Sequence, residues 1–316
     1  MLKLKYLTEN FDLARLALTH WKHDAATLEE RLGWFRISSN AVYPFDREGQ
    51  LCFLRLSPAA EKRSLDLLGE LDFLTFLQRR GYPAMRPIAA DDGDMLVPLD
   101  TQWGLWYASA FECVPGQPLE ELPMTDELAQ AYGAALGQLH RLSMHYAPPL
   151  KRSSHETAMA WIGQELAARG APEAAQDEAR EVARLLAEQP RSRCSYGLVH
   201  YDFEPDNVFW DGTRCHVIDF EDGMLHFYAI DLVQALDEIP ETYHGAFLQG
   251  YSGACPESAA DTADFPLMRR FRDLYSYARL LHALSEKPEL EPAWMPQLTA
   301  KLSGRLRELE SGICRG

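Results

Sequence analysis

The first part of the chain has mainly strand-like residue patterns and the rest has mainly helical ones. This change limits the folds that the chain can adopt. Residues 34–56 alternate β-branched and aromatic runs with turn residues and predict three antiparallel strands. Residues 59–80 return to helical spacing, and further strands are expected around 87–99 and 104–113. One or two helices are predicted to precede the strands, within residues 10–33. A strand-rich part with one main helix, followed by a helical part, indicates an α+β fold.

The remainder of the chain is predicted to be helical, with one exception. Residues 114–118, VPGQP, have the composition of a linker. We therefore expect a first domain at 1–113 and a second at 119–316. The exception is 196–222, which predicts a short hairpin rich in acids. The expected helices cover 125–143, 155–169, 173–188, 226–239, 241–251, 265–286 and 293–311.

Charge and composition narrow the functional classes. The 316 residues carry a formal net charge of −16, which disfavours nucleic acid and anionic membranes as partners. Charges interrupt the apolar runs of the N-terminus, and no stretch approaches the length of a membrane span, so neither a signal peptide nor a span is expected. The six cysteines are scattered without a C-x-x-C pair, which favours a reducing cytoplasm.

The acidic hairpin contains three oxygen-bearing side chains that suit phosphoryl transfer: Asp202, Asn207 and Asp219. Such transfer requires a hydroxyl held in line with the γ-phosphorus of ATP and a cation that neutralises phosphate charge. Asp202 would accept the proton of the attacking hydroxyl, and Asn207 and Asp219 would be ligands of Mg²⁺. Two carboxylates about 4 Å apart repel by roughly 4 kcal/mol at an effective dielectric near 20, which favours a metal between them.

The combined motifs resemble the aminoglycoside phosphotransferase and choline kinase family, whose members are relatives of protein kinases. That family carries H-G-D-x-x-x-x-N, then I-D-F or I-D-W, then D-L. This chain has His200-Tyr201-Asp202, Asn207, Ile218-Asp219-Phe220 and Asp231-Leu232 in the same order and at matching spacing.

The resemblance implies a protein-kinase-like fold of two lobes. A small antiparallel-sheet lobe with one main helix would bind ATP, and a larger helical lobe would hold the catalytic residues and the substrate. It also implies a catalytic Asp202, metal ligands Asn207 and Asp219, and structural support of the loop by His200 and Asp231. The chain departs from the family at Tyr201, where glycine is usual, and this leaves the substrate class open.

The resemblance extends back to about residue 35 and implies a phosphate-binding pair in the first lobe. Arg55 occupies the strand position at which protein kinases have lysine, and Glu70 matches the acidic residue that orients it. Leu54 and Leu56 flank Arg55, so strand alternation directs the arginine to the opposite face. A plain surface ion pair is the alternative reading.

Two further nucleotide contacts follow from the resemblance. Ser38, Ser39 and Asn40 would form the phosphate loop, although they include no glycine, so side chains would have to assist the backbone. Glu112 and Cys113 lie in a segment that resembles the hinge, whose backbone groups would read adenine.

Several residues also have a structural explanation. We interpret His200 as a hydrogen-bonded anchor rather than a base, because Asp202 already has the role facing the hydroxyl. Asp231 could support the loop or simply favour a helix N-terminus. Four other acids of the hairpin region are interpreted as solvent-exposed: Glu204, Asp206, Glu221 and Asp222.

These observations predict an ATP-dependent phosphotransferase that acts on the hydroxyl of a small molecule. The acidic field favours an amine-bearing acceptor, with homoserine, choline, hydroxylysine, a sugar amine and an aminoglycoside all open. One alternative is a protein Ser/Thr kinase, but the residues after Asp219 leave little room for an activation loop. The other is a nucleotide-binding pseudokinase, which Tyr201 and the glycine-free loop would explain.

Overall fold

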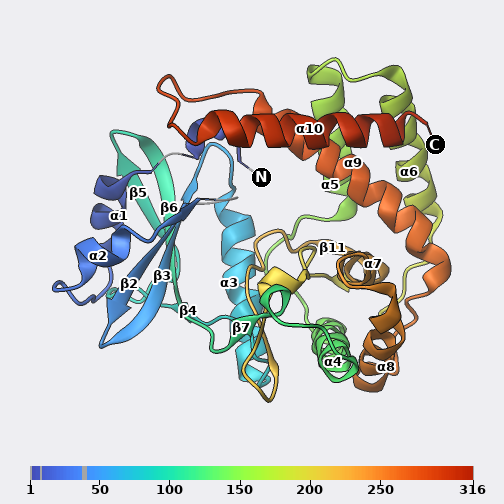
Figure 1. The fold of residues 1–316 in the computed structure, drawn as a ribbon, viewed down its shortest axis with the longest axis horizontal. Helices are drawn as coiled ribbons and strands as arrows, with labels where there is room; N and C mark the ends of the chain where they lie inside the picture. Colours follow the sequence, from blue (N-terminus) through green and yellow to red (C-terminus); the bar gives the residue numbers. More distant parts are fainter. Residues whose placement is uncertain (1, 8, 38–40, 316) are drawn as a thin grey trace.

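The computed structural model describes residues 2–7, 9–37 and 41–315, which form two lobes (Figure 1). Within these residues the first lobe contains a six-stranded antiparallel sheet in the order β1-β2-β3-β6-β4, with β5 also paired to β6. The strands are β1 (Arg36–Ile37), β2 (Ala41–Arg47), β3 (Gln50–Pro58), β4 (Pro87–Ile88), β5 (Val97–Thr101) and β6 (Gly104–Glu112).

Strand alternation in β3 gives the two faces of this sheet different partners. Leu54 and Leu56 belong to a core shared with α1 (Phe11–Leu18) and α2 (Leu28–Leu32). Arg55 points to the opposite face, toward α3, as its hydrogen bonds to that helix show. Figure 1 shows α1 and α2 on one side of the sheet and α3 on the other.

Helix α3 (Ser64–Arg79) connects the sheet to the second lobe. Leu68, which was also expected on the apolar face of this helix, is 39% exposed, whereas Leu67, Leu71, Leu74 and Leu77 are buried as expected. These side chains belong to the main core, which continues through the second lobe. The position of α3 is therefore set by both lobes.

Helices make up most of the second lobe, as expected. They are α4 (Asp126–Ser143), α5 (His155–Ala168), α6 (Glu173–Glu188), α7 (Ala229–Asp237), α8 (His244–Ala254), α9 (Phe265–Leu284) and α10 (Met295–Ile313). Glycines allow α4 and α8 to approach closely: a Cβ placed on Gly133 would lie 1.9 Å from the carbonyl oxygen of Phe247, and one on Gly250 would lie 2.0 Å from that of Gln130.

Short strands hold the acidic hairpin among these helices. Strand β9 (Val208–Trp210) pairs with β10 (Cys215–Val217) as predicted and also with β7 (Gln117–Pro118), which lies in the expected linker. Strand β8 (Tyr196–Leu198) pairs with β11 (Leu225–Phe227).

One sequence prediction of an element was wrong in detail. The helix expected from residue 226 begins only at Ala229, because Leu225–Phe227 pairs with β8 instead, a partner that is distant in the sequence. The segment expected to form strands around 87–99, with a turn at Asp91-Asp92-Gly93-Asp94, contains β4 and β5, which pair with different parts of β6.

The N-terminal segment packs against the start of α10, whose other end leads to the C-terminus (Figure 1). Leu2, Leu4 and Leu7 pack against Met295 of α10, and Lys3 and Lys5 pair with Glu286. Among the described helices, none has both the length and the apolar character needed to cross a membrane.

Candidate active site

The loop between β8 and β9 is held by one buried carboxylate, that of Asp231 in the first turn of α7. Its oxygens accept hydrogen bonds from the backbone N–H groups of His200 and Tyr201, both at 2.8 Å. The Nε2 atom of His140 lies 3.0 Å from the same carboxylate. Asp231 therefore does more than favour a helix N-terminus: it satisfies two loop amides at the position that the resemblance implies for structural support.

Tyr201 occupies a backbone position that favours glycine, with φ = 66°. Its carbonyl accepts a hydrogen bond from Gln234 at 2.7 Å. The ring is 3% exposed and packs edge-on against Phe271 and Tyr275 of α9. Burial of the aromatic ring offsets a backbone strain of about 1–2 kcal/mol. The side chain thus joins the catalytic loop to α9.

His200 is placed as an anchor. Its Nδ1 accepts the backbone N–H of Asp202 at 3.2 Å, so its Nε2 carries the proton and donates to the carbonyl of Ile218 at 2.9 Å. Burial lowers the pKa of this imidazole, which keeps it neutral. Both ring nitrogens are occupied, in agreement with the interpretation of His200 as an anchor rather than a base.

Asp202 and Asn207 lie in direct contact. The Asn207 amide donates to the Asp202 Oδ2 atom at 2.9 Å and to its backbone carbonyl at 3.0 Å. These two bonds use the amide N–H groups and leave the Asn207 oxygen as an acceptor. Burial, followed by the charge of Asp222, raises the pKa of Asp202 well above its usual range. A carboxylate with raised basicity suits the acceptance of a hydroxyl proton.

Asp219 follows β10 and completes the predicted set of three. Its backbone has φ = 60°, and burial followed by the charge of Glu221 raises the pKa of its carboxyl to about 7. A bound cation would favour the ionised form of such a group. Among the described residues no three His, Cys, Asp or Glu side chains are grouped to hold a metal. One carboxylate and one amide oxygen nevertheless fit Mg²⁺, which normally keeps waters and phosphate oxygens as its other ligands.

Arg55 and Glu70 form a buried pair of two parallel hydrogen bonds, at 3.0 and 2.6 Å. Their residues are 5% and 1% exposed, so the alternative of a surface ion pair was wrong. The guanidinium also lies 3.5 Å from Glu221 and packs over the ring of Phe111. Removal of Arg55 would leave the buried carboxylate of Glu70 without this partner, at a cost of about 3–5 kcal/mol.

The other predicted nucleotide contacts are placed only in part. Ser38, Ser39 and Asn40 lie outside the described residues. Glu112 and Cys113 are exposed at the end of β6, and their backbone N–H groups donate to the carbonyls of Arg86 and Leu51 at 2.9 and 3.1 Å. Adenine would have to be read by other backbone groups of this segment.

The acids after Asp219 correct a sequence prediction. Glu221 was expected in solvent, but its side chain is 6% exposed and pairs with Lys62 and Arg55. Asp222 is also largely buried and lies 2.6 Å from Arg279 of α9. Glu204 is half-buried, whereas Asp206 is exposed as expected. The sequence offered no local signal for these partners, because Lys62 and Arg279 are distant along the chain.

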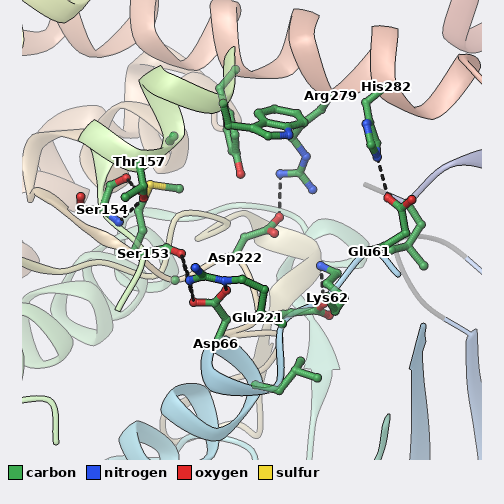
Figure 2. Close-up of a pocket in the computed structure, with 18 of the residues that line it drawn as sticks. Glu61, Lys62, Asp66, Ser153, Ser154, Thr157, Glu221, Asp222, Arg279 and His282 are labelled. Carbon is green, nitrogen blue, oxygen red and sulfur yellow. Dashed lines mark hydrogen bonds and ion pairs between the residues drawn. The ribbon is translucent and has the colours of Figure 1, made fainter. Parts of the chain in front are cut away.

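A cavity of about 530 Å³ lies beside the pair of Asp222 and Arg279 and extends between the lobes (Figure 2). Its wall comes from the segment that precedes α3 and the start of that helix, from the start of α5, from residues 221–224, and from α9. Figure 2 shows Arg279 and Asp222 pointing toward one another at this cavity. Such a volume is typical of small-molecule sites.

His140 is the site residue that sequence reasoning missed. It lies on α4, is fully buried and contacts the carboxylate of Asp231 on α7. Its Nδ1 atom lies 2.9 Å from the hydroxyl of Tyr251. No spacing in the sequence links α4 to α7.

The chain belongs to the phosphotransferase enzyme family, whose sequence pattern matches residues 37–263. This match covers more than half of the chain and includes the motifs from His200 to Leu232. The architecture is the protein-kinase-like fold of two lobes that the resemblance implies.

Two curated relatives illustrate the sequence similarity. An amicoumacin kinase of Bacillus subtilis (strain 168) is 24% identical over 199 residues, which cover 62% of this chain and 59% of the relative. A homoserine kinase of Caulobacter sp. (strain K31) is 29% identical over 220 residues, which cover 65% of this chain and 66% of that protein. The matched region thus spans less than two thirds of either relative.

Solved structures share the fold over nearly the full length. An amicoumacin kinase in complex with AMP-PNP, Ca²⁺ and Ami has a TM-score of 0.74 at 20% identity, with 96% of this chain and 94% of that chain covered. A microcompartment-associated aminopropanol kinase has a TM-score of 0.70 at 21% identity, with 96% and 95% covered. At these identities the likeness concerns the fold alone.

Proposed function

We propose that the protein transfers the γ-phosphoryl group of ATP to a hydroxyl of a small, amine-bearing molecule. The observation that carries this function is the contact of Asp202 with Asn207, together with the β9–β10 hairpin, which brings Asn207 and Asp219 to one end. The curated relatives, which are kinases of amicoumacin and of homoserine, support a small-molecule acceptor.

Each side chain of the set would have a defined role. Asp202 orients the acceptor hydroxyl and accepts its proton as the O–P bond forms. Asn207 and Asp219 would hold Mg²⁺, which supplies neutralisation of charge on the β- and γ-phosphates when it is bound. Arg55, oriented by Glu70, contacts phosphate oxygens of the nucleotide.

The two lobes have different roles in the proposed reaction. Residues 1–113 form the nucleotide-binding lobe, 114–118 the hinge, and 119–316 the lobe that holds the catalytic residues and the acceptor. The phosphate loop at Ser38, Ser39 and Asn40 and the adenine contacts near Glu112 and Cys113 complete the nucleotide site. The cysteines of the described residues are free thiols, which suits a reducing cytoplasm.

The chain segment after Asp219 argues against a protein kinase. Strand β11 begins at Leu225 and α7 at Ala229, so only a few residues separate the metal ligand from the next paired strand. An activation loop of the protein-kinase type would need a longer segment there.

Acceptor-stimulated release of ADP from Mg-ATP tests the proposal. The panel contains amino alcohols, hydroxylated amino acids, aminoglycosides, sugars and a generic protein substrate. Asp202→Asn should lower turnover by about 100-fold or more because the proton acceptor is lost, while Mg-ATP binding stays close to that of the parent.

The controls separate the alternatives. Nucleotide binding without turnover of any acceptor would favour the pseudokinase, and stimulation by the protein substrate alone would favour the protein kinase. Equal turnover by the parent and Asp202→Asn would contradict the catalytic assignment.

A further inference from the structure

The charges around the cavity differ in balance from those of the chain as a whole. The sequence has a formal net charge of −16, but four carboxylates and four Lys or Arg side chains line the cavity, together with His282. The acidic field of the molecule is therefore not concentrated at this wall. A ligand with several positive charges would find no excess of carboxylates there.

Three of the four carboxylates have basic partners from the same wall. In each pair the contact is short enough for a direct ion pair or a charge-assisted hydrogen bond. The pairs are Arg63–Asp66 at 2.7 Å, His282–Glu61 at 2.5 Å, and Lys62–Glu221.

The fourth pair is Arg279 with Asp222. The two side chains are 2.6 Å apart and 17% and 20% exposed, so both are desolvated yet reachable from the cavity. A guanidinium has five N–H donors and a carboxylate about four acceptor positions. One contact between them leaves each group able to bind a ligand.

Ring contacts connect this pair to the catalytic loop. The Arg279 guanidinium lies 5.4 Å from the ring centre of Tyr275, and that ring lies 5.2 Å from the ring of Tyr201, the residue before Asp202. The ring of Tyr275 therefore links the wall of the cavity to the residue that precedes the proposed proton acceptor.

We infer that this cavity binds the phosphate acceptor and selects a small hydroxylated zwitterion, with its ammonium group on Asp222 and its carboxylate on Arg279. The inference rests on the proposed function and narrows it from amine-bearing acceptors in general to those with one ammonium and one carboxylate group. A planar guanidinium can fork onto a carboxylate, and the carboxylate of Asp222 can accept a hydrogen bond from the ammonium. The hydroxyl of such an acceptor is left to meet Asp202.

Four acceptors that share a 3-hydroxypropyl group isolate the two charges. Homoserine has both, 3-aminopropanol has the ammonium alone, 4-hydroxybutyrate has the carboxylate alone, and 1-propanol has neither. Each charge-assisted contact contributes enough for homoserine to exceed either singly charged acceptor about tenfold or more in kcat/KM.

Two substitutions, one of each partner in the pair, test which charge of the acceptor each side chain binds. Arg279→Met should lower kcat/KM for homoserine about tenfold or more and leave 3-aminopropanol unchanged or improved, because Asp222 loses its internal partner. Asp222→Asn should lower kcat/KM for 3-aminopropanol and raise it for 4-hydroxybutyrate. Arg63→Met removes another arginine of the wall, one paired with Asp66, and should keep the parent ranking.

The possible outcomes distinguish a failure of the inference from a failure of the proposed function on which it rests. The inference is overturned if 3-aminopropanol or an aminoglycoside equals homoserine, or if both variants lower all acceptors by the same factor, as a purely structural pair would. Absence of acceptor-stimulated ADP release from every compound tested would overturn the proposed function itself.

Discussion

One residue of the loop between β8 and β9 shows how tertiary contacts can offset local backbone strain. Tyr201 adopts φ = 66°, which an L-residue seldom does, yet its ring is buried against α9. Its hydroxyl is buried and has no hydrogen-bond partner among the described residues. The ring therefore stabilises the fold while the hydroxyl opposes it.

Two substitutions of Tyr201 should have opposite effects on stability. Tyr201→Phe should leave the free energy of unfolding equal or higher, because an unsatisfied buried hydroxyl costs about 1–3 kcal/mol. Tyr201→Gly relieves strain but deletes the ring, and the net loss should be about 2 kcal/mol or more. Urea unfolding followed by circular dichroism measures both. A clear loss in Tyr201→Phe would mean that the hydroxyl has a partner after all.

At the scale of elements, α3 is fixed by an arginine from the segment before α5. Arg152 is 5% exposed and donates to the carbonyl of Asp66 at 3.2 Å and to that of Gly223 at 2.8 Å. Its side chain crosses α3 at Gly69, the residue before Glu70. The same guanidinium thus joins the helix that orients Arg55 to the segment that follows Asp219.

Substitution of Gly69 by alanine tests this contact. A Cβ there would lie 2.5 Å from Nη1 and 2.8 Å from Cδ of Arg152, so the guanidinium would have to leave its carbonyl partners. We expect Gly69→Ala to lower the free energy of unfolding by about 1–3 kcal/mol despite its gain in helix propensity.

Gly163→Ala on α5 is the matched control. A Cβ at this position would meet nothing within 4 Å, so the substitution should stabilise the protein by about 0.5–1 kcal/mol. If the two variants changed the unfolding midpoint equally, the contact of Arg152 with α3 would not contribute to stability.

For the whole molecule, buried histidines make stability depend on pH. His155 of α5 and His226 of β11 are 1% and 0% exposed, and their rings are 5.0 Å apart. Burial lowers the pKa of both imidazoles, and for His226 the neighbouring His155 adds to this. In the unfolded chain a histidine takes up its proton near pH 6.5. The unfolded state therefore binds more protons below that pH, and the free energy of unfolding falls as pH is lowered.

His226→Asn should reduce this dependence. The amide oxygen can take the place of Nδ1, which accepts the backbone N–H of Phe227 at 2.7 Å, but the side chain does not titrate. The slope of unfolding free energy between pH 6.5 and 5 should decrease relative to the parent, as measured by urea unfolding at several pH values. His145→Asn replaces an exposed histidine and should keep the parent slope. A slope in His226→Asn equal to that of the parent would contradict the prediction.

The spacing of residues was enough to predict an α+β chain and the order of most elements, and the motifs that include Asp202, Asn207 and Asp219 implied the two-lobe fold through their resemblance to a known family. These features depend on contacts within a few residues: strand alternation places Arg55 opposite Leu54 and Leu56, and the short β9–β10 hairpin brings Asn207 and Asp219 to one end. Helical spacing likewise predicted four buried leucines of α3, Leu67, Leu71, Leu74 and Leu77, although it wrongly added Leu68. Local geometry alone determines such features.

Contacts between distant segments could not be read in the same way. The exposure of Glu221 and Asp222 was predicted wrongly because Lys62 and Arg279 come from other parts of the chain. The pairing of β8 with β11 and the bond from His140 to Asp231 have the same origin. Whether a charge is solvated or paired depends on what the folded chain places beside it, and spacing along the sequence contains no such information.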